Sequence, residues 1–163
     1  MNIVAIVQAR LGSTRLPNKV MAPLQKTPLI EFLINRLSKS QLINKIVVAT
    51  STNPINDPLT SFIEDLGYQV IRGSEDDVLQ RFIDAANATS ADVIVRITGD
   101  CPLVDPQLVD DLVQEFLHTQ VDYLSNTNPP TYPDGFDIEV FSANSLKIAG
   151  KLATVIFDRE HVT

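Results

Sequence analysis

Short apolar runs that read as strands alternate with segments that begin like helices along this chain. The early runs, such as residues 2–7, 45–50 and 92–97, are almost continuous in apolar and β-branched side chains. Such runs are typical of parallel strands that are buried on both faces. The pattern therefore predicts a three-layer α/β/α fold around a mainly parallel sheet. Further strands are expected at 69–72, 121–124 and 136–141.

Three helices are expected to begin where a capping residue precedes a proline, which suits the first helical position. These pairs are Thr27-Pro28, Asp57-Pro58 and Asp105-Pro106. Ser74 followed by Asp77 resembles a capping box and predicts a helix over about residues 74–88. Gly67 is expected to end the helix that begins at Asp57, and Gly150 to end one that begins near Ser142.

The last predicted strand alternates between apolar and acidic side chains. Phe136, Ile138 and Val140 share one face, while Asp137 and Glu139 share the other. Because successive side chains of a strand point to opposite faces, we expect one face to pack on the core and the acidic face to line a cleft.

The loop after the first strand is rich in positive charge, although the chain as a whole has a net charge of −7. It carries Arg10, Arg15 and Lys19 around a turn that includes Gly12 and Ser13. Guanidinium and ammonium groups bind phosphate oxygens, and small residues let backbone N–H groups approach them. The loop is therefore a candidate phosphate site, the alternative being an ordinary solvated loop. It matches neither the Walker A motif nor GxGxxG.

The loop after the strand at 92–97 reads TGDCPL and places Asp100 in a tight turn. Ligands of open parallel sheets bind beyond the carboxyl ends of the strands, where this loop and the Arg/Lys loop both lie. A carboxylate that faces a phosphate-binding loop could hold Mg²⁺, which usually takes one or two carboxylates together with phosphate oxygens. The alternative is that Asp100 only caps its own turn.

Length and composition limit the classes of protein to which the chain could belong. We expect residues 1–163 to form one domain. The acidic balance, with a pI of about 4.7, argues against nucleic-acid binding. Neither a signal peptide nor a membrane span is evident, and the single cysteine fits a reducing compartment. We therefore expect a cytoplasmic protein without nucleic-acid or membrane partners.

With both loops identified, the chain resembles the sugar-acid cytidylyltransferases, the family of CMP-sialic acid and CMP-KDO synthetases. The resemblance is strongest to the branch called spore coat polysaccharide biosynthesis protein F, and it covers residues 3–163. The motifs that carry it are QARLGSTRLPNK, RGSEDDVLQRF, RITGDCPLVDP, YPDGFDIEVFS and DREHVT, in that order.

The resemblance implies a nucleotide-binding fold of the GT-A type, shared with nucleotide-diphospho-sugar transferases. It also implies an Mg²⁺-dependent enzyme that joins a hydroxyl of a sugar or sugar acid to the α-phosphate of CTP and releases pyrophosphate, for surface polysaccharide biosynthesis. Arg10, Arg15 and Lys19 would be catalytic. The implied nucleotide-binding set is Ala9, Arg10, Gly12, Ser13, Arg15, Lys19, Arg72 and Ser74. Asp100 would bind the metal, and Asp137 and Glu139 would lie near the sugar.

The sequence departs from the pattern of the family in two ways. Asn18 stands where the branch usually has glycine, and asparagine also tolerates a left-handed backbone. Relatives continue well beyond DREHVT, where they carry a second metal-binding aspartate and much of a homodimer contact. We therefore expect that the family's C-terminal part is missing from a chain ending at Thr163, and that this chain is weakly active or inactive.

The sequence leaves two other functions open. One is a GT-A glycosyltransferase that uses a sugar nucleotide as donor, although TGDCP lacks the DxD-type metal motif usual in that class. The other is a nucleotide-binding module without catalytic activity. Release of pyrophosphate from CTP in the presence of a sugar acid would distinguish the cytidylyltransferase from both.

Overall fold

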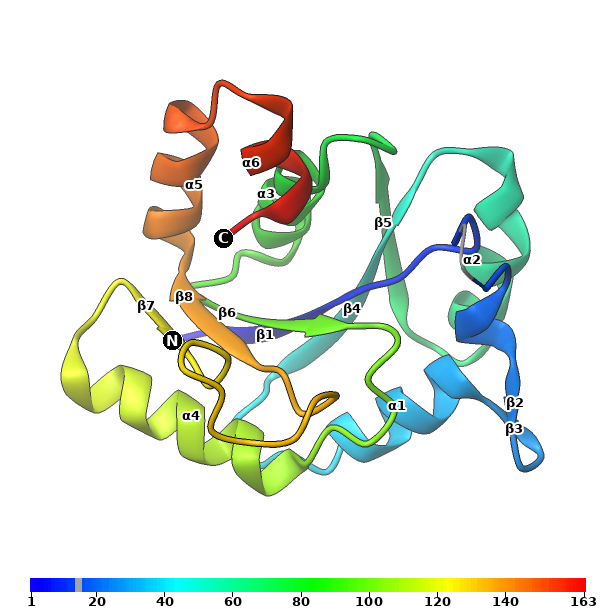
Figure 1. Cartoon of the computed structure of the whole chain (residues 1–163), viewed down its shortest axis with the longest axis horizontal. Coiled ribbons are helices and arrows are strands. Elements are labelled where there is room, and N and C mark those ends of the chain that lie inside the picture. The colour runs from blue at the N-terminus through cyan, green and yellow to red at the C-terminus, as the bar shows by residue number, and fades with distance from the viewer. Residues whose placement is uncertain (14–15) are drawn as a thin grey trace.

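The structure is a computed structural model that describes residues 1–13 and 16–163. Within these residues, six strands form one sheet in the order β5-β4-β1-β6-β8-β7 (Figure 1). The strands are β1 (Ile3–Gln8), β4 (Lys45–Ser51), β5 (Gln69–Gly73), β6 (Val93–Thr98), β7 (Tyr123–Ser125) and β8 (Glu139–Ser142). β1 pairs in parallel with β4 and β6, and β4 with β5, whereas β8 runs antiparallel to both β6 and β7. The prediction of a mainly parallel sheet is confirmed.

Helices cover both faces of the sheet, so the predicted three layers are present (Figure 1). One core lies between the sheet and α1, α2 and α4, and the other lies between the sheet and α3 and α5. In β1, Ala5 and Val7 belong to the first core, whereas Val4 and Ile6 belong to the second. This is why β1 is a continuous apolar run. The helices are α1 (Leu29–Leu37), α2 (Asp57–Asp65), α3 (Val78–Thr89), α4 (Pro106–Thr119), α5 (Ala143–Leu152) and α6 (Ile156–His161).

Two of the predicted helix ends are confirmed. The Asp105 side chain accepts hydrogen bonds from the backbone N–H groups of Gln107 and Leu108, at 2.8 and 3.2 Å, and so caps α4. Gly67 follows the last turn of α2 with a φ of +86°, the left-handed conformation that glycine adopts without strain.

Other predicted helix starts are wrong by one element or by a few residues. Thr27-Pro28 forms β3, which pairs with β2 (Pro23–Leu24) in a small hairpin before α1, so Thr27 does not cap that helix. Asp57 lies inside the first turn of α2 rather than before it. In the third case Asp77, not Ser74, caps α3, because its carboxylate accepts from the backbone N–H of Gln80 at 2.9 Å.

Gly150 lies inside α5 rather than at its end, so that prediction is also wrong. A Cβ at this position would approach Cδ1 of Ile83 to 2.4 Å. Glycine therefore allows α5 to lie close against α3, a packing role that the local sequence does not distinguish from a helix stop.

The alternation predicted for residues 136–141 is confirmed in part. Ile138 and Val140 are fully buried in the first core, and Glu139 points to the other side. The strand itself begins only at Glu139, and Phe141 is buried in the second core. On the second face, Glu139 is therefore partly exposed, whereas Phe141 is buried. Of the helices in the described residues, none has the length and apolar character needed to cross a membrane.

Candidate active site

A cavity of about 320 Å³ lies at the carboxyl edge of the sheet, between the loops that follow β1 and β6. The two strands are paired neighbours, with Gln8 opposite Thr98 at their ends, so both loops leave the sheet at the same place. The predicted meeting of these loops is present in the structure. The cavity is lined by Gln8, Ala9, Arg10, Ser13, Lys19, Val20, Thr98, Gly99 and Asp100.

Gly99 permits the close approach of the two loops. Its backbone N–H donates to the carbonyl of Gln8 at 2.8 Å. A Cβ on Gly99 would lie 2.9 Å from both the carbonyl oxygen of Gln8 and the Cβ of Ala9. Because these atoms belong to or adjoin the backbone, any side chain at position 99 would push the β6 loop away from β1.

Lys19 and Asp100 face each other across the cavity. Nζ of Lys19 lies 2.5 Å from Oδ2 of Asp100. Partial burial would raise the pKa of the Asp100 carboxyl, but the hydrogen bond and charge of Lys19, together with a hydrogen bond from Thr98, outweigh it. The pKa of Asp100 is therefore below its usual value, and the carboxylate is ionised at neutral pH.

The rest of the β1 loop is held by the neighbouring loops. The backbone N–H of Leu11 donates to Oδ1 of the buried Asn56 at 2.8 Å. Asn18 adopts a φ of 58°, which confirms that asparagine takes the left-handed conformation at this turn. Gly12 and Ser13 lie beside Arg10 in the sequence, and Arg10 lines the cavity. Arg15, predicted to be catalytic and to bind phosphate, lies outside the described residues.

Arg72 and Ser74 are placed on the β5 side of the loops, and neither is among the described residues that line the cavity. Arg72 donates to the carbonyls of Ser51 and Asn53 at 3.1 and 3.2 Å, and pairs with Asp57 at 2.8 Å. It therefore braces the loop after β4. Ser74 is exposed, and its hydroxyl accepts from the backbone N–H of Asp77.

Asp137 opens onto a second cavity, of about 520 Å³, which shares Thr98 and Asp100 with the first. Asp134 also lines this second cavity. Burial, followed by repulsion from Asp134, Glu139 and Asp100, raises the pKa of Asp137. This part of the site is therefore acidic.

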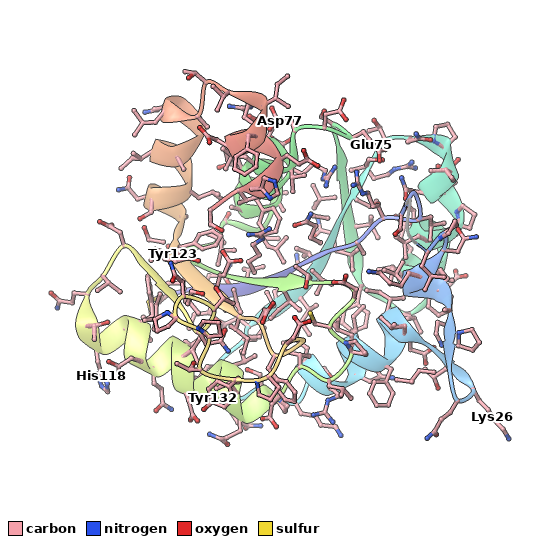
Figure 2. All side chains as sticks on the ribbon, in the orientation of Figure 1. Lys26, Glu75, Asp77, His118, Tyr123 and Tyr132 are labelled. Atoms are coloured by element: carbon pink, nitrogen blue, oxygen red, sulfur yellow. The ribbon has the colours of Figure 1, made fainter. Side chains whose placement is uncertain are left out.

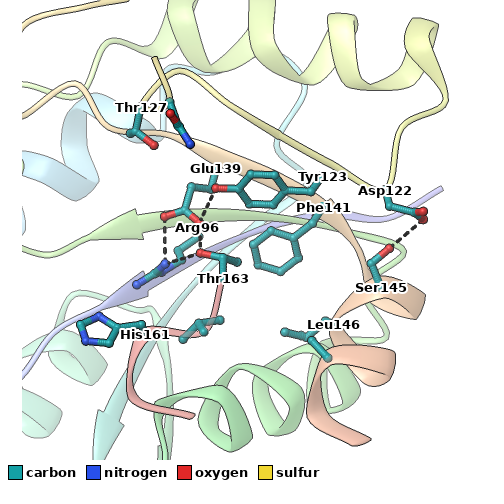
Figure 3. Close-up of a pocket in the computed structure, with 13 residues that line it drawn as sticks. Arg96, Asp122, Tyr123, Thr127, Glu139, Phe141, Ser145, Leu146, His161 and Thr163 are labelled. Atoms are coloured by element: carbon teal, nitrogen blue, oxygen red, sulfur yellow. Dashed lines mark hydrogen bonds and ion pairs between the residues drawn. The ribbon is translucent and has the colours of Figure 1, made fainter. Parts of the chain in front are cut away.

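Glu139 lines a third cavity, of about 620 Å³, on the face of the sheet that α5 covers (Figure 3). Its carboxylate pairs with Arg96 at 2.8 Å and accepts hydrogen bonds from the hydroxyls of Tyr123 and Thr163. Arg96 also donates to Oε1 of Gln8 at 3.4 Å, which connects this cavity to the wall of the first. Asp137 and Glu139, predicted to share a sugar site, thus open onto different cavities.

Sequence reasoning missed three charged residues that organise the loops: Glu75, Arg81 and Arg96. Glu75 stands in a run of three acids after β5, and nothing in the sequence shows which of them faces the site. Arg81 and Arg96 lie inside a helix and a strand, where charged side chains usually reach solvent. Only the packing shows that Arg81 is 1% exposed and that Arg96 pairs with a strand neighbour.

Asp100 offers one carboxylate to a magnesium ion, whose remaining ligands would have to come from outside the described side chains. Among the described residues, no cluster of three or more His, Cys, Asp or Glu side chains could hold a metal. Asp100 supplies an ionised carboxylate beside the Arg10 and Lys19 side chains. Because Mg²⁺ is commonly bound through one or two carboxylates plus substrate phosphates, this arrangement suits a metal that arrives with a phosphate ligand.

Fold and site together define an α/β protein with a cation-lined pocket at the carboxyl edge of a parallel sheet. The sequence profile described as cytidylyltransferase matches residues 4–163. The chain therefore belongs to the cytidylyltransferase family.

Individual relatives agree with this assignment. The chain is 43% identical over 163 residues to an uncharacterized protein of Methanocaldococcus jannaschii, covering all of this chain and 66% of that one. It is 38% identical to the spore coat polysaccharide biosynthesis protein SpsF of Bacillus subtilis, over 99% of this chain and 68% of that protein. Identity to a 3-deoxy-manno-octulosonate cytidylyltransferase of Trichlorobacter lovleyi is 35%, covering 72% and 46%. The chain thus spans at most about two thirds of these relatives.

A solved cytidylyltransferase from Leptospira borgpetersenii has the same fold. It superposes with a TM-score of 0.95 at 37% sequence identity, covering 99% of this chain and 69% of that chain. The GT-A-type α/β fold implied by the family resemblance is therefore present.

Proposed function

We propose that this chain carries the nucleotide-binding site of an enzyme that transfers CMP from CTP to a sugar or sugar acid. The observation that carries the proposal is the pairing of Lys19 with Asp100 at 2.5 Å across the cavity closed by Gly99. A cation for phosphate and a carboxylate for metal meet there, in the crevice where such sheets bind ligands.

The triphosphate would lie along the β1 loop. Lys19 and Arg10, with Arg15 on sequence grounds, would neutralise the phosphates, and Ala9, Gly12 and Ser13 would allow the backbone to approach them. Arg72 and Ser74, at the end of β5, would lie near the cytosine. Their position on the far side of the β4 loop agrees with a nucleotide that extends from Asp100 toward β5.

Asp100 would hold Mg²⁺ together with phosphate oxygens. When bound, the metal would supply positive charge to the α-phosphate and to the leaving pyrophosphate. In the reaction, a hydroxyl of the acceptor would attack the α-phosphorus in line, and the bond to pyrophosphate would break. The protein would hold the reacting groups in position and would supply fixed charges. The hydroxyl proton would pass to solvent water, and Lys19 and Arg10 would stabilise the charge on the leaving group.

The cavity around Glu139 is our candidate for the acceptor. It combines an apolar floor of Phe141 and Leu146 with the hydroxyls of Tyr123 and Ser145 (Figure 3). A sugar presents both apolar C–H faces and hydroxyls. Asp137 lines a separate cavity together with Asp100, and that cavity is the alternative place for the acceptor. The proposal includes a role in polysaccharide biosynthesis, a cytoplasmic location and a homodimer of the whole enzyme.

Calorimetry with CTP, UTP, ATP and GTP in the presence of Mg²⁺ tests the nucleotide site. CTP should bind best, and equal affinities for all four would contradict the proposal. Pyrophosphate release with CTP and a panel that includes KDO and sialic acid tests the reaction. Because this chain spans about two thirds of its relatives, selective CTP binding without turnover would support a binding module only if a chain extended through the relatives' C-terminal part is also inactive.

A further inference from the structure

The carboxylate of Glu75 is anchored from below by buried polar groups. Its Oε2 accepts a hydrogen bond of 2.5 Å from the hydroxyl of Ser51. That hydroxyl in turn accepts from Nδ2 of Asn56 at 2.7 Å, and both Ser51 and Asn56 are fully buried. Because neither partner can turn toward solvent, this oxygen of Glu75 has a fixed position.

The backbone of Glu75 is fixed as well. Nη1 of Arg81 donates to the carbonyls of Ser74 and Glu75, at 2.5 and 2.9 Å. Arg81 lies under the loop with almost no exposure, and it fits there because Gly73 has no side chain: a Cβ would lie 2.8 Å from Cγ of Arg81. Glu75 is therefore held at both its carbonyl and its carboxylate.

The other carboxylate oxygen of Glu75 faces the predicted phosphate loop. Oε1 lies 3.4 Å from Nη1 of Arg10, and a Cβ on Gly12 would be 3.8 Å from the same oxygen. Arg10 lines the cavity that also holds Lys19 and Asp100. The carboxylate of Glu75 is therefore held in a fixed position beside Arg10, one of the cations of the pocket.

We propose that Glu75 is a fixed counter-charge, which weakens the hold of Arg10 on anions. The proposal rests on the proposed function, in which Arg10 meets the phosphates of CTP. An anion on Arg10 must share the guanidinium with the fixed carboxylate, so anions such as free pyrophosphate are bound less tightly. Mg-CTP would meet the same counter-charge at Arg10, but it would keep further contacts, to Asp100 and on the β5 side, that free pyrophosphate lacks.

The test is calorimetry of inorganic tripolyphosphate, without metal, on the whole chain and on Glu75→Gln. The amide keeps an oxygen for the Ser51 hydroxyl but removes the charge beside Arg10. At low salt we expect the variant to bind tripolyphosphate about three- to ten-fold more tightly, the size of one partly screened charge at close range. The gain should shrink as ionic strength rises. A purely structural role for Glu75 would give weaker binding instead.

Asp76→Asn is the matched control, because Asp76 is the adjacent exposed carboxylate and forms no hydrogen bond or ion pair with the described side chains. It should leave tripolyphosphate affinity almost unchanged. Thermal unfolding shows whether each variant folds. Should Glu75→Gln fail to fold, Glu75→Asp, which withdraws the charge from Arg10, should give a smaller gain in the same direction.

Unchanged or weaker binding by folded variants overturns the inference. The outcomes also separate it from the proposed function. If the unmodified chain binds CTP selectively but Glu75→Gln binds tripolyphosphate no more tightly, only the inference about Glu75 is wrong. If no variant binds CTP or tripolyphosphate, both the inference and the proposed function are wrong. If Glu75→Gln binds tripolyphosphate more tightly but the chain does not prefer CTP, only the proposed function is wrong.

Discussion

At the scale of single residues, the chemistry of the pocket depends on which carboxylate each cation meets. Lys19 meets Asp100 at 2.5 Å, while Arg10 meets Glu75 at 3.4 Å. All four side chains are partly exposed, so neither pair is a large source of stability. Each pair instead partly neutralises a cation of the pocket, and so sets the local charge beside which a ligand would bind.

Lys19→Ala should weaken triphosphate binding by about 1.5–3 kcal/mol, the range for hydrogen bonds to charged groups. Lys26→Ala is the control, since Lys26 projects from the β2–β3 turn at the outer end of the molecule (Figure 2). Calorimetry with CTP measures both. Equal losses in the two variants would show that the loop acts only as a diffuse basic surface.

Asp137 should lower stability at neutral pH, because burial and its acidic neighbours raise its pKa. A raised pKa means that the folded state binds the proton more tightly than the unfolded state, so ionisation costs stability as pH rises above about 4. Asp137→Asn should therefore raise the thermal midpoint at pH 7 and lose this advantage below about pH 4. Asp111→Asn removes an exposed carboxylate from α4 and controls for the loss of one negative charge.

At the scale of elements, the register between β1 and β6 brings the two loops of the candidate site together. Gln8 lies opposite Thr98, and the next residue on the β6 side is Gly99, which touches the β1 backbone. The lengths of β1 and β6 thus determine where the two loops begin. The absence of a Cβ in Gly99 determines how closely the β6 loop approaches β1.

Gly99→Ala should cost about 1–3 kcal/mol of stability, as overpacking does where the neighbours cannot move. It should also weaken CTP binding, because the β6 loop that carries Asp100 must shift. Gly12→Ala is the control for stability, since its Cβ would meet only Oε1 of Glu75, at an ordinary 3.8 Å. Denaturant unfolding compares the two, and an equal cost would argue against the close approach as the cause.

At the scale of the whole molecule, the site is assembled from segments that are far apart in the sequence. Loops after β1, β4, β5 and β6 meet at one edge of the sheet, and β8 adds Glu139 from the antiparallel side. Buried polar side chains such as Asn56 and Arg81 join these loops, so the pocket depends on the fold as a unit.

Mg²⁺ should bind weakly to the chain alone and more tightly together with CTP. The reason is that Asp100 supplies one carboxylate, which already faces Lys19, and phosphate oxygens must supply the rest. Asp100→Asn should abolish the Mg²⁺ dependence of CTP affinity while leaving the thermal midpoint near that of the unmodified chain. The control variant Asp134→Asn should keep the Mg²⁺ dependence of CTP affinity. If CTP affinity still depended on Mg²⁺ in Asp100→Asn, the assignment of Asp100 as the metal ligand would be wrong.

The sequence by itself determined the layers, the central parallel strands and the edge at which the site lies. Continuous apolar runs such as β1 reveal burial on both faces, and carboxyl ends of parallel strands share one edge, so Lys19 and Asp100 could be predicted as neighbours. Asp105 and Gly67 act locally, through their own backbone, and were predicted correctly for that reason.

Only the tertiary structure decided the features that depend on contacts between distant segments. Gly150 serves the packing of α5 on α3, and Thr27 joins a hairpin instead of capping a helix. The separation of Asp137 from Glu139 follows from where β8 begins, and the choice of Glu75 over its acidic neighbours follows from Ser51 and Arg81. Local sequence reports propensity and periodicity, whereas these outcomes depend on which side chains share space once the chain is folded.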